Sequence, residues 1–170
     1  MQKMNSLQIG ARALVFITAC ACIAANASEP CFSAAARIVR AEGAPAQMEM
    51  QAFLRTFSDS HCRGNTEYSE TGNEIIFDAI EKHPAQFFGA LFALGEREMA
   101  AVQANIDNPL HDCINVARRV EAVRQSRDMP DALKRRALQF LEAARRKEAA
   151  MIRAWEIRNN RKWSWDDCAR

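Results

Sequence analysis

The placement of proline constrains the fold of this chain more than any other feature of its sequence. The chain has five prolines, and each stands at the edge of an apolar segment and not inside one. Proline fits the first turn of a helix, and the residue before it avoids the helical conformation, so such prolines separate one helix from the next. No segment alternates with the period of two that a strand requires, and no Asn-Gly or Asp-Gly hairpin turn occurs. The sequence therefore predicts an all-α fold.

Apolar residues spaced three and four apart locate the individual helices. Segments with this spacing are expected at 31–42, 45–57, 84–94, 99–107, 110–127 and 130–158. A further helix ends at His83, and its start has two candidates: a capping box formed by Thr71 and Glu74, or an earlier start near Asn65. Residues 61–65 are expected to form a polar loop. These segments predict a helical bundle or a short stack of antiparallel helical hairpins, and no repeat recurs at a fixed period.

The first part of the chain has the three features of a secretory signal peptide. Lys3 and Arg12 give a positively charged start, an apolar run covers 13–25, and Ala25-Asn26-Ala27 fits a cleavage site. The run is shorter than the ~20 apolar residues that span a bilayer. We therefore expect cleavage after Ala27, which leaves residues 28–170 as a single helical domain in the periplasm or outside the cell.

Cys20 leaves a second route to the cell envelope open. Ile17-Thr18-Ala19-Cys20 resembles a bacterial lipoprotein box, in which the cysteine is lipidated and becomes the first residue of the mature protein. However, the apolar run continues past Cys20 to Ala25, whereas a lipoprotein usually turns polar soon after its cysteine. Soluble export is the favoured prediction, and a lipid-anchored envelope protein is the alternative.

Four cysteines remain in the predicted mature chain, namely Cys31, Cys62, Cys113 and Cys168. An even number of cysteines in an exported protein indicates two disulfides. A hairpin of the first two predicted helices would bring Cys31 near Cys62. A tail over 159–170 that doubles back would bring Cys168 near Cys113, so we favour these two pairs. A metal site is not predicted, because no C-x-x-C pair occurs and the four cysteines are far apart in sequence.

No arrangement of residues in the sequence matches a known catalytic motif. His111, Asp112 and Cys113 are adjacent, but adjacent residues on a helix point about 100° apart, so the three cannot converge as a triad. No H-E-x-x-H, G-x-S-x-G or phosphate-binding glycine loop occurs. The sequence therefore predicts neither an enzyme nor a bound metal or cofactor. The alternative is an enzyme or metal binder that uses Glu70, Glu74, His83 or His111.

The charges of the predicted mature chain are balanced overall but unevenly distributed. The whole chain has 23 basic and 21 acidic residues, and the signal peptide removes two basic ones, which leaves 21 of each. Residues 28–112 hold six basic and thirteen acidic residues, whereas 113–170 hold fifteen basic and eight acidic ones. Three explanations stay open: the two halves pack against each other, one face binds a charged partner, or a basic helix rests on anionic lipid.

Three groups of residues are candidates for binding a partner. They are an acidic stripe (Glu67, Glu70, Glu74 and Asp78), a basic cluster (Arg145, Arg146 and Lys147), and two tail tryptophans (Trp163 and Trp165). Trp and Arg are enriched among the residues that dominate binding energy at interfaces. The simpler explanation is that the charged groups are solvated helix faces and that the tryptophans pin the tail to the bundle.

Export, paired cysteines and the lack of a catalytic motif together suggest a binding protein. The first hypothesis is a periplasmic immunity or enzyme-inhibitor-like protein that occludes a protein partner. The alternative is a structural, adaptor or chaperone-like protein of the cell envelope, bound to the membrane only if Cys20 is lipidated. A nucleic-acid partner is not expected, because the predicted mature chain is formally neutral.

Overall fold

The computed structural model describes residues 30–109 and 114–165, and every regular element in these ranges is a helix. The predicted all-α class is therefore confirmed for this part of the chain. The predicted signal peptide, Cys20, His111, Cys113 and Cys168 lie outside the described residues.

The helices follow one another with short connections. They are a helix at 30–40, α2 (Gln47–Arg55), α3 (Ser60–Arg63), α4 (Thr66–Lys82), α5 (Pro84–Leu91), α6 (Glu96–Asp107), α7 (Val116–Gln125) and α8 (Asp131–Asn159). Pro84 occupies the first turn of α5, and His83 before it ends α4, as the sequence predicted.

Short side chains that cap the backbone decide where α3 and α4 begin. Asp59 accepts a hydrogen bond from the backbone N–H of His61 at 2.8 Å and starts α3 just before the predicted polar loop, so residues 61–63 of that loop are helical. Asn65 accepts one from the backbone N–H of Tyr68 at 2.9 Å and starts α4. The predicted start at Thr71 is wrong and the earlier candidate is correct, because starting at Asn65 also buries the Tyr68 side chain.

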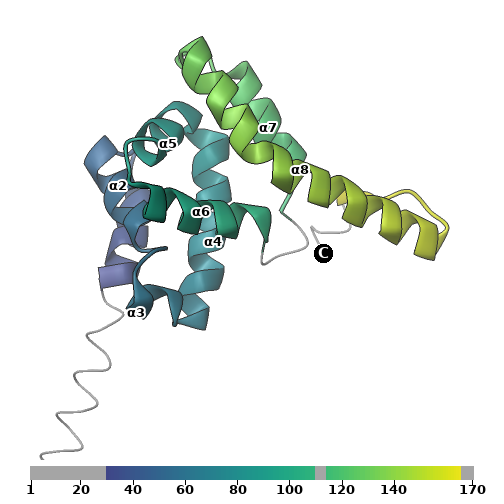
Figure 1. Ribbon diagram of the computed structural model, residues 1–170, viewed down its shortest axis with the longest axis horizontal. Coiled ribbons are helices and arrows are strands. Elements are labelled where there is room, and N and C mark those ends of the chain that lie inside the picture. The colour runs from purple at the N-terminus through teal and green to yellow at the C-terminus, as the bar shows by residue number, and fades with distance from the viewer. Residues whose placement is uncertain (1–29, 110–113, 166–170) are drawn as a thin grey trace, which may run out of the picture.

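The central helix of the fold is α4, which contacts α3, α5, α6 and α7 (Figure 1). The side chains of Ile76, Phe77 and Ile80 on α4 are fully enclosed, and α5 contributes Phe87 and Phe88 to the same core. Burying an apolar side chain of this size stabilises the fold by roughly 1.5–3 kcal/mol relative to leaving it exposed. This core holds the position of the helices that carry the candidate site.

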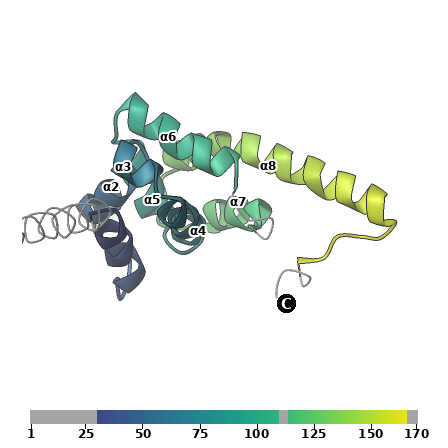
Figure 2. The ribbon, with the colours of Figure 1, turned by 90° about the horizontal axis from the view of Figure 1, so that it is seen from below.

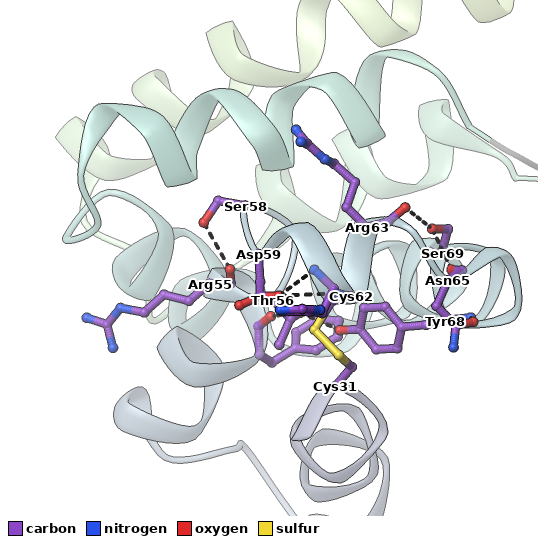
Figure 3. Close-up of a disulfide and its surroundings, with 12 residues drawn as sticks. Cys31, Arg55, Thr56, Ser58, Asp59, Cys62, Arg63, Asn65, Tyr68 and Ser69 are labelled. Carbon is purple, nitrogen blue, oxygen red and sulfur yellow. Dashed lines mark hydrogen bonds between the residues drawn. A yellow bond between two sulfur atoms is a disulfide. The ribbon is translucent and has the colours of Figure 1, made fainter. Parts of the chain in front are cut away.

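The disulfide between Cys31 and Cys62 ties the helix at 30–40 to α3, with the two Cα atoms 5.6 Å apart. This predicted pair is confirmed. In Figure 3 the disulfide lies beside Thr56 and Tyr68, whose hydroxyl groups are hydrogen-bonded to each other. Burial raises the pKa of Tyr68 to about 12, against a smaller lowering by the Thr56 hydrogen bond. The predicted pair Cys113–Cys168 lies outside the described residues.

The last helix, α8, packs only its first part on the bundle. It contacts α7, α6 and α5, and its buried side chains are Ala137, Leu141, Ala144 and Glu148. Beyond Glu148, none of the described residues is buried. Figures 1 and 2 both show this end of α8 extending past the other helices.

Candidate functional site

The end of α8 and the segment that follows it form the most distinctive surface of the described chain. We call residues 149–165 the arm. Its helical part, 149–159, is about three turns or roughly 16 Å long. Glu148, the residue just before the arm, anchors α8 to the bundle and so fixes where the arm begins.

Glu148 joins α8 to the N-terminus of α7. Its two carboxylate oxygens accept hydrogen bonds from the backbone N–H groups of Val116 at 2.5 Å and Ala117 at 3.0 Å. A carboxylate is stabilised at this end of a helix, where N–H groups lack partners within the helix. Burial nevertheless raises the pKa of Glu148, and the two backbone hydrogen bonds only partly oppose that shift.

The chain turns back along α8 immediately after the helix ends. Asn160 adopts a left-handed backbone conformation (φ 48°), which reverses the direction of the chain. The backbone N–H of Trp163 then donates to Oε1 of Glu156 at 3.1 Å, and Nζ of Lys162 lies 3.6 Å from the other oxygen. Residues 160–165 are therefore held against α8 and do not leave it as a free tail.

Three tryptophans stack edge to face along the arm. The ring centroids of Trp155 and Trp163 are 5.0 Å apart, and those of Trp163 and Trp165 are 5.5 Å apart. The guanidinium of Arg161 lies 4.7 Å from the ring of Trp155. Trp163 and Trp165, which the sequence suggested as partner-binding residues, are thus partly buried: Trp163 stacks on Trp155, and Trp165 stacks on Trp163.

The predicted basic cluster is split between internal contacts and solvent. Arg145 makes two 3.0 Å hydrogen bonds to the carboxylate of Glu142. Lys147 donates to the carbonyl oxygen of Asp107 at 2.9 Å, which ties α8 to the end of α6. Arg146 is exposed, and its Nε is 3.8 Å from Glu142. The side chain of Arg146 is 71% exposed, against 43% for Arg145.

Two residues that sequence reasoning missed extend the exposed face of Arg146 along the arm. Arg153 is exposed, and no acidic group within the described ranges pairs with it. Ile157 is 81% exposed, which is unusual for a large apolar side chain. Their spacing of seven and eleven residues from Arg146 puts them on the same face of α8. That spacing is a signal in the sequence, but only the fold distinguishes this face from the one that packs.

The predicted acidic stripe lies on the exposed face of α4. Glu67, Glu70, Glu74 and Asp78 are all exposed. Asp78 accepts a 2.9 Å hydrogen bond from Lys82 on its own helix. Three residues after Asp78, Glu81 pairs with Arg118 and Arg119 of α7. The acidic and basic halves of the chain therefore meet at Glu81, while the stripe itself faces solvent.

Neither a metal centre nor a membrane span occurs within the described ranges. No group of three or more His, Cys, Asp or Glu side chains in these ranges could hold a metal ion. Among the same residues, no helix combines the length and the apolarity needed to cross a bilayer. Three residues named for the alternative of an enzyme or metal binder lie on or beside α4: His83 is half-buried between α4 and α5, and Glu70 and Glu74 are exposed on α4.

Over the described residues, the fold and the arm define an all-helical, disulfide-containing domain whose last helix, α8, projects from the bundle. Comparisons of the chain with protein-family models, curated proteins and solved structures found no match.

Proposed function

We propose that this chain is an exported protein-binding domain that uses the arm to occlude a protein partner, as a periplasmic immunity protein or enzyme inhibitor would. The observation that carries the proposal is the projection of α8 beyond Glu148, its last buried residue. The arm continues a 29-residue helix, but no described side chain beyond Glu148 is buried in the bundle. Because most helical stability in proteins comes from tertiary packing, the packing available to this part of α8 comes from the returning tail.

The support given by the tail makes the arm suitable for binding. Stacking of Trp163 on Trp155 and the hydrogen bond to Glu156 fix the tail and the helix together. A surface that is ordered before binding loses less conformational entropy when a partner arrives. Exposed arginines and a nearly uncovered isoleucine on this surface match the residue types found at the centre and rim of protein interfaces.

Export is supported by two features of the chain. The signal-like segment at 1–27 predicts secretion. The Cys31–Cys62 disulfide is consistent with it, because disulfides persist mainly in oxidising compartments.

The test is an affinity pull-down with the mature chain as bait. We expect one stoichiometric protein from the cell-envelope extract, or from the extract of a competing cell, that survives moderate salt. Trp155→Ala, which removes the stacking support of the tail, should lose this protein. Gln139→Ala, on an exposed part of α8 over the bundle, should retain it. No specific partner from either extract, or equal capture by the Trp155→Ala bait, would reject the proposal.

A further inference from the structure

We infer that the partner presents an acidic protein surface to one face of the arm, and that this face sets the specificity of binding. We call this face the arginine stripe: Arg146, Ala150, Arg153 and Ile157. The inference rests on the proposed function, because it identifies the kind of protein that the arm occludes.

The spacing and exposure of the stripe make it one continuous surface. Its four members recur at intervals of four, three and four residues, so they follow one another along a single face of α8. All four are exposed. Ala150 and Ile157 are the apolar members, and they alternate with the two exposed arginines.

The stripe carries positive charge because the acidic side chains near it are bound to other groups. Residues 145–165 contain seven basic and two acidic side chains. One acid, Glu148, is bound to the N-terminus of α7, and the other, Glu156, is bound to the tail. Glu142, just before this range, lies 3.8 Å from Nε of Arg146, whereas no acid among the described residues pairs with Arg153. The stripe therefore presents positive charge that a carboxylate-rich surface would complement.

Arginine also favours carboxylates by its geometry. The planar guanidinium donates two parallel N–H groups that match the two oxygens of an aspartate or glutamate. Flanking apolar side chains such as Ile157 exclude water from such a pair and strengthen it. Alternating arginine and apolar residues thus fit a helix or loop of a partner that carries acidic residues beside apolar ones.

A lipid surface fits the same charge less well. A helix that lies on a membrane inserts a broad apolar face and keeps its basic residues at the edge of that face. The more apolar side of the arm carries Ile152 and Trp155, and Trp155 is stacked with Trp163 of the returning tail. The basic stripe contains one large apolar residue, Ile157, so it offers little to insert.

The chain offers matched controls on the same helix. Ala132 and Arg135 are both exposed, and each precedes a member of the stripe (Ala150 and Arg153) by eighteen residues. Eighteen residues are five whole turns, so each control points in the same direction as its counterpart, about 27 Å away. Placing a photo-reactive amino acid at Ala150 or at Ala132 in the mature chain would label what touches each position in the envelope extract.

We expect the probe at Ala150 to cross-link one protein through a segment rich in Asp and Glu, and the probe at Ala132 to cross-link none. Arg153→Glu should weaken binding of that purified protein about tenfold, with a steep dependence on salt. Arg135→Glu should change the affinity less than twofold.

Several results would overturn the inference. Equal labelling from both positions, a labelled segment without acidic residues, or equal effects of the two charge reversals would each reject it. Binding of the mature chain to phosphatidylglycerol vesicles that Arg153→Glu abolishes, without any protein cross-link, would identify a membrane surface instead. If the pull-down yields a partner that requires Trp155 but binds Arg153→Glu and Arg135→Glu equally well, the proposed function stands and this inference fails.

Discussion

Replacing Glu148 with leucine would test whether α7 depends on a carboxylate supplied by α8. Val116 is fully buried, so its backbone N–H cannot turn to water if Glu148 is lost. A buried donor without an acceptor costs about 1–3 kcal/mol. The negative charge adds nothing further to this cost, because burial outweighs the contacts that favour the charged form and raises the pKa of Glu148. We expect a net loss of about 2 kcal/mol, or a melting temperature lower by roughly 6–8 °C.

The assay is thermal and urea unfolding of the mature chain, followed by circular dichroism at neutral pH. Glu148→Gln keeps one acceptor oxygen, so it should cost less, about 1 kcal/mol. Gln139→Leu serves as the control, because Gln139 is exposed on the same helix. If Glu148→Leu is as stable as the wild type, the carboxylate does not hold α7 and the reasoning is refuted.

The difference in unfolding free energy between the wild type and Glu148→Gln should change with pH in a defined direction. Burial raises the pKa of Glu148 above its ordinary value of 4.5. The folded protein therefore binds this proton more tightly than the unfolded chain does. The contribution of Glu148 to stability is complete below about pH 4.5 and decreases as the pH rises through the folded pKa. Consequently, the stability gap between wild type and Glu148→Gln should widen on acidification from neutral pH, and a gap that narrows would contradict the assigned cause.

Three further predictions concern the bundle. Tyr68 is the only tyrosine, so near-ultraviolet absorbance should show a single phenol ionising near pH 12. Because the folded protein holds this proton more tightly than the unfolded chain, the free energy of unfolding should fall from about pH 10 through pH 12, and Tyr68→Phe should remove that fall. Replacing Cys31 and Cys62 together with serine opens a loop with a sequence separation of 31, which should lower the unfolding free energy by about 3–4 kcal/mol in urea titrations. Asn73→Ala removes a buried 3.0 Å hydrogen bond to the carbonyl oxygen of Asn105, so it should cost about 1–2 kcal/mol and speed amide exchange in α6.

The sequence predicted features that depend on local chemistry. A proline restricts its own backbone and that of the residue before it, so Pro84 fixed the boundary between α4 and α5 without any tertiary contact. Cys31 and Cys62 could be paired because two short helices between them leave few ways to close the hairpin. The start of α4 was ambiguous, because Asn65 and Thr71 both carry capping side chains and burial of Tyr68 decides between them.

The candidate site, in contrast, depends on contacts between residues far apart in the chain. Glu148 caps Val116 across 32 residues, and nothing in the local sequence distinguishes it from the other glutamates of a charged helix. The sequence left open whether Trp163 binds a partner or pins the tail, and the chain reversal at Asn160 stacks it on Trp155 of α8. Composition determined that the end of the chain would be basic and aromatic. Packing determined that the tryptophans support the arm while Arg153 and Ile157 face solvent, because a helix face is defined only by what lies against the opposite side.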